Sequence, residues 1–137
     1  MSDSSLLFFT AVNSKYHQFV LPFIYFAAQF NHNSIFEILF TDEIPGEIKN
    51  GVKYLKEYLS ISNILLRKID TNIIPQNLRF LETPTYNSTY TYISDIDILI
   101  CESILYFHKN NLIDNCYHNV VRGYCNKQTL MSRTTFL

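Results

Sequence analysis

The sequence Tyr90-Thr-Tyr-Ile-Ser-Asp95-Ile-Asp97-Ile-Leu-Ile100 decides the fold, because it sets two carboxylates one residue apart between two apolar runs. The isoleucines and aromatic residues on either side predict buried strand. A charge at the end of a buried strand needs a compensating partner, and two neighbouring carboxylates also repel each other. A divalent cation with oxygen ligands, Mn²⁺ or Mg²⁺, compensates both, and it usually arrives with substrate phosphates. We therefore interpret Asp95 and Asp97 as a metal–diphosphate site.

The spacing of the two acids supports this interpretation. Alternate residues of a strand point to the same side, so we expect Asp95 and Asp97 to face one cation, directly or through a water. The alternative is that the pair lies in a solvated turn or caps a helix.

The composition bounds the class of protein. With 137 residues, we expect a single domain that spans residues 1–137. The content of 47% hydrophobic and 15% aromatic residues is typical of a folded protein rather than a disordered one. A net charge of -1 lacks the basic excess of nucleic-acid-binding proteins, so we expect no nucleic-acid partner.

The sequence also indicates a compartment. No apolar run reaches the roughly 18–20 residues of a transmembrane helix, and the N-terminal residues lack the basic region of a signal peptide. Three cysteines without Cys-x-x-Cys spacing favour reduced thiols over disulfides or a zinc site: Cys101, Cys116 and Cys125. We expect a cytoplasmic protein that could lie peripherally at the inner membrane face.

Strands and helices are expected to alternate along the chain. Apolar runs predict strands at Leu6–Val12, Ile35–Phe40 and Ile64–Ile69, before the strand that leads to the acidic pair. Helical spacing predicts a helix over Tyr16–Phe30, capped by Ser14 and kinked at Pro22, and a second helix with Ile48, Val52, Leu55 and Leu59 on one face. We expect short helices at Asn77–Glu82 and Glu102–Lys109, and a strand at Tyr117–Arg122.

This order predicts an α/β fold with a mostly parallel sheet and helices on both faces, in the manner of Rossmann-like proteins. Ligands of such folds bind at the carboxyl ends of the strands, near the point where the strand order reverses. Thr10–Asn13, Asp42 and the acidic pair all follow or end predicted strands. We therefore expect one shared site built from these segments.

Around the acidic pair the chain resembles the GT-A-fold glycosyltransferases, most closely the family 8-like bacterial transferases that build lipopolysaccharide and capsule. Tyr92–Ile100 is similar to their aromatic-x-x-Asp-x-Asp-hydrophobic segment, and Phe9–Tyr16 to their first strand and nucleotide-binding loop. Arg79 lies 16 residues before Asp95, similar to the family's arginine ahead of the acids. The resemblance covers roughly residues 6–102.

The resemblance implies a nucleotide-sugar-binding set that consists of Thr10, Ala11, Asn13, Tyr16, Arg79, Ser94 and Asp95. In such a site Asp95 and Asp97 hold Mn²⁺ or Mg²⁺ on the diphosphate, the end of the first strand lines the base and ribose pocket, and Arg79 approaches the donor sugar or diphosphate. Metal and arginine stabilise the negative charge that grows on the leaving nucleoside diphosphate. We expect a UDP-linked donor and a glycan or lipid-linked acceptor.

The chain departs from the family after the acidic pair. Only Cys101–Leu137 remains where the family usually has its acceptor half and often a metal-binding histidine. We infer a shortened chain, the nucleotide-sugar-binding half of a GT-A enzyme, whose catalytic residue is not identified. Strand edges left by the missing half could be covered by homo-oligomerisation.

Other interpretations of the same residues remain open. Tyr16 could belong to the core or to a helix start, Arg79 could pair with Glu82, and Asp42 could cap a turn. The four histidines show no ligand spacing. A different function is also compatible with the fold: a non-catalytic interaction or assembly protein with a vestigial Asp-x-Asp. A phosphatase-like fold is a third hypothesis.

Overall fold

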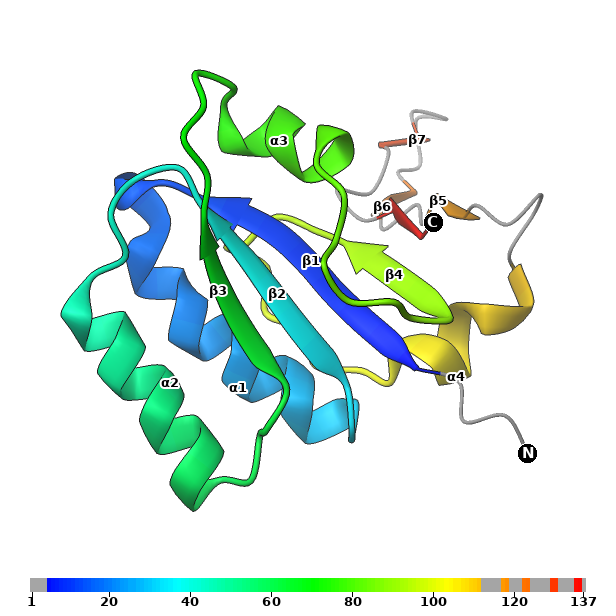
Figure 1. Cartoon of the computed structure of the whole chain (residues 1–137). Coiled ribbons are helices and arrows are strands. Elements are labelled where there is room, and N and C mark those ends of the chain that lie inside the picture. Colours follow the sequence, from blue (N-terminus) through cyan, green and yellow to red (C-terminus); the bar gives the residue numbers. More distant parts are fainter. Residues whose placement is uncertain (1–4, 112–116, 119–121, 124–128, 131–134, 137) are drawn as a thin grey trace.

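The computed structural model describes residues 5–111 and the strand residues 117–118, 122–123, 129–130 and 135–136. Helices and strands alternate over most of this range (Figure 1). In chain order the elements are β1 (Leu6–Val12), η1 (Ser14–Phe19), α1 (Val20–Phe30), β2 (Ile35–Phe40), α2 (Gly46–Tyr58), β3 (Ile64–Lys68), α3 (Pro75–Leu81), β4 (Tyr90–Ile93), α4 (Ile104–His108), η2 (Lys109–Asn111), β5 (Tyr117–His118), β6 (Arg122–Gly123), β7 (Thr129–Leu130) and β8 (Thr135–Phe136).

The main sheet has the strand order β3-β2-β1-β4-β8-β5. Its first four strands are parallel, and β8 runs antiparallel to both of its neighbours. The chain moves outward from β1 through β2 to β3, and then returns to place β4 on the other side of β1. The strand order therefore reverses between β1 and β4, where such folds bind ligands. The predicted mostly parallel sheet is confirmed.

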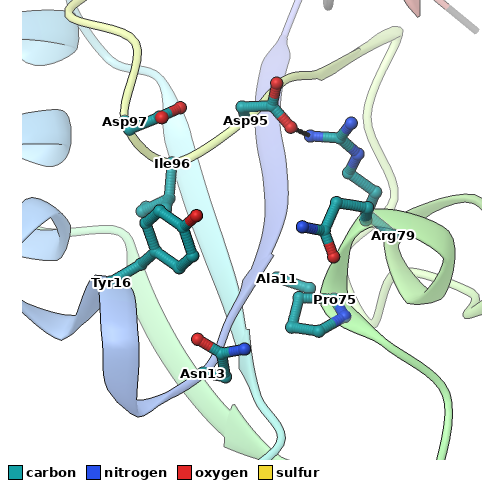
Figure 2. Close-up of a pocket in the computed structure, with 9 residues that line it drawn as sticks. Ala11, Asn13, Tyr16, Pro75, Arg79, Asp95, Ile96 and Asp97 are labelled. Carbon is teal, nitrogen blue, oxygen red and sulfur yellow. Dashed lines mark hydrogen bonds and ion pairs between the residues drawn. The ribbon is translucent and has the colours of Figure 1, made fainter.

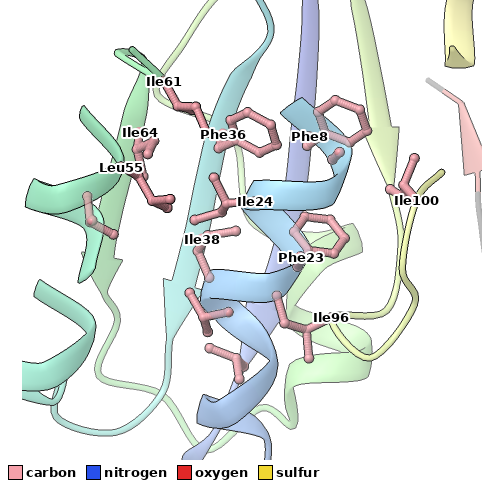
Figure 3. Close-up of a cluster of buried hydrophobic side chains, with 14 of the residues drawn as sticks. Phe8, Phe23, Ile24, Phe36, Ile38, Leu55, Ile61, Ile64, Ile96 and Ile100 are labelled. Carbon is pink, nitrogen blue, oxygen red and sulfur yellow. The ribbon is translucent and has the colours of Figure 1, made fainter. Parts of the chain in front are cut away.

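The two faces of the sheet are covered by different helices. The side chains of Leu6, Phe8 and Val12 join a large buried cluster with α1 and α2, in which Phe8 stacks on Phe36 (Figure 3). The alternate residues Leu7, Phe9 and Ala11 form a smaller cluster with Leu78 of α3. Because side chains alternate along a strand, a run of seven buried residues in β1 contributes to both clusters. The predicted coverage of both faces is confirmed.

The first helix begins later than its periodicity predicts. A 3₁₀ segment precedes Val20, so Pro22 is the third residue of α1 instead of a mid-helix residue. The first-turn amides of a helix have no intrahelical acceptor, and a proline there costs no hydrogen bond. The predicted kink is therefore wrong. The capping residue is Asn13 rather than Ser14: its side chain accepts a hydrogen bond from the amide of Lys15.

The second flank of the acidic pair is also different from the prediction. Strand β4 ends at Ile93, and Ile98–Ile100 is irregular although it is apolar. Ile96 and Ile100 are buried in the cluster under α1, 5% and 3% exposed (Figure 3). Apolarity here reflects packing from a loop into the core, which a short apolar run does not distinguish from a strand.

Three further boundaries shift. The helix α3 starts at Pro75 instead of Asn77, and the helix expected at Glu102–Lys109 is reduced to α4 and the η2 turn. The single strand predicted at Tyr117–Arg122 is wrong: β5 pairs with β8 in the main sheet, whereas β6 pairs with β7 in a separate one, and residues 119–121 lie outside the described part of the chain. Within the described residues, no helix is long and apolar enough to cross a membrane.

Candidate functional site

A pocket of about 400 Å³ opens where β1 and β4 end. Its walls come from the end of β1, the η1 segment, the first turns of α3 and the turn after β4 (Figure 2). The lining residues are Ala11, Asn13, Tyr16, Pro75, Gln76, Arg79, Asp95, Ile96 and Asp97. The structure thus brings together six of the residues expected at the site, from segments spread between residues 11 and 97.

Two expected residues lie behind the pocket wall. Thr10 and Ser94 are both 0% exposed, and neither lines the pocket. The hydroxyl of Thr10 donates a hydrogen bond of 2.7 Å to the backbone carbonyl of Ser94, whereas the Ser94 hydroxyl has no partner among the described residues. Neither side chain faces the pocket in this structure, and their contact with a ligand stays a prediction. Thr10 instead ties the end of β1 to the residue that precedes Asp95.

The two acids reach the pocket from a turn instead of from a strand. Between them Ile96 is buried in the core, while Asp95 is half-buried and Asp97 is exposed. Figure 2 shows Asp95 and Asp97 on the pocket side of this turn. The expectation of a common side thus holds for a different physical reason: burial of Ile96 fixes the turn between the two acids.

Arg79 pairs with Asp95, and this contact crosses from α3 to the turn after β4. Its Nη1 donates to the Asp95 carboxylate (Figure 2), and Arg79 is 8% exposed. The guanidinium carbon also lies 5.0 Å from the ring centroid of Phe80. The alternative partner Glu82 pairs with Arg67 instead, and its carboxylate accepts a hydrogen bond of 3.1 Å from that side chain. A buried guanidinium paired in this way forms a cationic wall beside the acids.

The opposite wall is fixed by hydrogen bonds at the start of η1. The Asn13 side chain accepts from the amide of Lys15 at 3.1 Å, and Asp42 accepts from the amide of Ser14 at 2.7 Å. Asp42 therefore holds the loop instead of lining the pocket, as the turn interpretation expects. Tyr16 takes both of its expected roles, since it lines the pocket and packs against the large core cluster.

Pro75 and Gln76 are pocket residues that the sequence analysis missed. The helix expected at Asn77–Glu82 does not include them, whereas Pro75 is the first residue of α3. Proline is favoured at the first position of a helix, so Pro75 itself was the signal for the helix start. A helix from residue 75 sets Gln76 three positions before Arg79, and residues three apart share one helix face. Both therefore reach the pocket from the same side.

The donor set suits a hard divalent cation only together with another ligand. Two carboxylates, Asp95 and Asp97, line the pocket, and no group of three His, Cys, Asp or Glu side chains within the described residues could hold a metal. Mg²⁺ is commonly bound by one or two carboxylates with substrate phosphates and waters, and Mn²⁺ accepts the same oxygens. The residues present therefore fit a cation that a phosphate ligand helps to hold.

The histidines and the cysteine with described side chains take no part in this pocket. The His108 ring nitrogen lies 2.7 Å from the Glu102 carboxylate, and the His17 ring packs against Phe40. His32 and Cys101 are exposed. His118, Cys116 and Cys125 lie outside the residues whose side chains are described.

Comparison with known proteins shows the fold. No protein-family model and no curated protein matches the sequence. The structure is similar to the crystal structure of the apo-form glycosyltransferase GlyE from Streptococcus pneumoniae TIGR4, with a TM-score of 0.63 and 15% sequence identity over 99% of this chain. The match covers 33% of the GlyE chain, so this chain spans about a third of that length. The chain therefore has a glycosyltransferase-like α/β fold.

Proposed function

We propose that the chain binds a nucleotide-sugar with Mn²⁺ or Mg²⁺ in the pocket at the ends of β1 and β4, as the donor-binding half of a GT-A-like glycosyltransferase. The observation that carries the proposal is the convergence of Asp95, Asp97 and Arg79 on one cavity at the reversal of strand order. This is where α/β folds of this kind bind ligands. The fold shared with a solved glycosyltransferase adds to the argument.

The residues suggest how the donor lies. Asp95 and Asp97 would hold the cation, whose bound charge stabilises the diphosphate as a leaving group. Arg79 donates hydrogen bonds to the same phosphates, because a guanidinium matches phosphate oxygens with two parallel bonds. Ala11, Asn13 and Tyr16 then face the nucleoside from the other wall, where Asn13 keeps its amide nitrogen as a donor while its oxygen caps η1.

In the proposed transfer, the bond between the anomeric carbon and the diphosphate oxygen breaks, and the nucleoside diphosphate leaves with the electron pair. The acceptor hydroxyl forms the new bond to the anomeric carbon and releases its proton to water. The chain's contribution is to orient the donor and to stabilise the leaving charge with Arg79. We further propose that the nucleotide is UDP and that the acceptor is a glycan or is lipid-linked, in cell-surface glycan synthesis. We also propose that the protein is cytoplasmic and self-associates.

Calorimetry with UDP tests the proposal. We expect UDP to bind in the presence of Mn²⁺, to bind much more weakly with EDTA, and to lose metal-dependent binding in the double variant Asp95→Ala/Asp97→Ala. Asp70→Asn, which removes a surface carboxylate outside the pocket, is the matched control and should bind as the wild type does. Absence of binding by the wild-type protein would favour the alternative, a non-catalytic interaction protein with a vestigial acidic pair.

A further inference from the structure

Arg79 already occupies the carboxylate that a metal ion would use. Its Nη1 is paired with Oδ1 of Asp95, and the two side chains are 9% and 16% exposed. An ion held by Asp95 and Asp97 would lie next to the guanidinium, and two neighbouring positive charges repel each other. The ion and Arg79 therefore compete for one carboxylate.

Few events can separate Arg79 from Asp95. Its guanidinium stays protonated at all physiological pH values, and a buried charge needs an anionic partner. Its backbone is held in place, because the preceding residue Leu78 is 2% exposed and packs against β1 in the smaller core cluster. Once an ion holds both Asp95 and Asp97, the side chain can thus leave Asp95 only when a further anion is present in the pocket. A diphosphate is such an anion and accepts two hydrogen bonds from a guanidinium.

We propose that Arg79 acts as a placeholder cation: it neutralises Asp95 in the ligand-free protein and transfers to the diphosphate when donor and metal bind together. This inference rests on the proposed nucleotide–metal function of the same pocket. It makes metal and nucleotide binding mutually dependent, since each ligand removes the obstacle to the other. Thermodynamic linkage requires that the same factor describes both directions.

Titration with Mn²⁺ followed by electron paramagnetic resonance tests the competition. Arg79→Gln should bind Mn²⁺ alone about tenfold more tightly than the wild type, because a charge-assisted hydrogen bond to Asp95 is removed. UDP should tighten Mn²⁺ binding about tenfold or more in the wild type, within the usual range of coupling between sites, and much less in the variant. If Arg79 only helped to bind the ligands, Arg79→Gln would instead weaken binding of both Mn²⁺ and UDP.

Lys15→Gln is the control for a general charge effect. Lys15 is exposed, and it lies next to Tyr16 without lining the pocket. The control should leave Mn²⁺ affinity nearly unchanged. An equal gain in this variant, or no gain in Arg79→Gln, would overturn the placeholder role. Circular dichroism establishes whether Arg79→Gln is folded.

A measurement on the wild-type protein needs no variant. The side-chain Nε resonance of Arg79 should be unchanged by Mg²⁺ alone, and should shift when Mg²⁺ and UDP are added together. A shift with Mg²⁺ alone would contradict the inference. If UDP binds with the metal but Arg79→Gln shows wild-type Mn²⁺ affinity, only the placeholder role fails. If UDP binds to neither protein, the proposed function fails, and the placeholder role fails with it.

Discussion

Two arginine–carboxylate pairs lie on the α3 side of the molecule, and they differ in what surrounds them. Glu37 in β2 is 0% exposed, and its carboxylate forms an ion pair of 2.9 Å with Arg67. It also accepts hydrogen bonds from the backbone amide of Thr85 at 2.9 and 3.0 Å. Arg79 and Asp95 form the other pair, which borders an open pocket of about 400 Å³.

The comparison separates a structural pair from a ligand-facing one. Arg67 also binds the Glu82 carboxylate and the carbonyl of Thr83, so this pair joins β2, β3 and the loop after α3 in one closed network. Both arginines leave a buried Nε without a partner among the described residues, so that atom does not distinguish them. The surroundings of the two carboxylates differ. Glu37 accepts hydrogen bonds from backbone amides, whereas Asp95 lines a cavity together with a second acid. We therefore expect substitutions of the first pair to affect stability and substitutions around the second to affect binding.

The largest expected effect is on folding. Glu37→Ala should lower the free energy of unfolding by about 3–5 kcal/mol, because it removes one of the two carboxylates paired with the partly buried Arg67 guanidinium and leaves the Thr85 amide without its acceptor. Urea denaturation followed by circular dichroism measures this. Glu57→Gln is the control, since it breaks an exposed pair with Lys53 at 4.0 Å and should change stability by less than about 0.5 kcal/mol. A loss of similar size in both variants would break the comparison.

Removal of the hydrogen bond that joins β1 to the segment before Asp95 should have an intermediate effect. Thr10→Val removes the hydroxyl that donates to the buried carbonyl of Ser94 and should cost about 1–3 kcal/mol of stability. It should also weaken Mn²⁺-dependent UDP binding, because the turn that carries Asp95 loses an anchor. Thr10→Ser keeps the hydroxyl and should restore affinity. If Thr10→Val lowers stability but leaves the affinity for UDP unchanged, the sheet and the pocket are independent.

The exposed acid should separate binding from stability. Asp97→Asn should leave the free energy of unfolding within about 0.5 kcal/mol of the wild-type value, since Asp97 is exposed. It should weaken Mn²⁺-dependent UDP binding about tenfold, which corresponds to about 1.4 kcal/mol. Calorimetry and thermal denaturation on the same preparation test both parts. A clear loss of stability without loss of binding would assign Asp97 to the structural class.

A surface ion pair should show the smallest effect. The hydrogen bond from Lys68 to Glu43 raises the pKa of the Lys68 ammonium above 10.5. A raised pKa in the folded state stabilises the fold below the unfolded-state pKa, and this contribution is lost as the pH rises through the folded-state value. Glu43→Gln should therefore lower the Lys68 pKa, measured by NMR titration. The stability lost at pH 7 should be too small to measure, because solvent screens this exposed pair. An unchanged pKa would show that Glu43 is not its main cause.

The sequence predicted the regular part of the fold because patterns of burial are local. The run Leu6–Val12 is apolar throughout and is buried on both faces, and the spacing of Ile48, Val52 and Leu55 matches the buried face of α2. The convergence at the carboxyl ends of strands followed from topology, so Asn13 and Asp95 were expected in one place. Arg79 was expected there only from the family resemblance, because it lies on a helix.

Details that depend on tertiary contacts could not be predicted in this way. The partner of Arg79 was ambiguous, because Glu82 is near in sequence and Asp95 is near only in space. The resemblance led us to expect Thr10 at the ligand. Its hydrogen bond to Ser94 could not be foreseen, because the two residues are 84 positions apart. Ile98–Ile100 has the composition of a strand, and only the packing of Ile96 and Ile100 under α1 shows that it is a loop.

The buried isoleucine between the two acids has a consequence for how this segment tolerates change in length. Ile96 is held in the interior, so the positions of Asp95 and Asp97 on either side of it are fixed at the pocket. Inserting or deleting one residue here would either drive an acid into the interior or expel the isoleucine, and each outcome costs folding free energy. The spacing of the two acids is therefore maintained by the stability of the domain, even where binding does not require it.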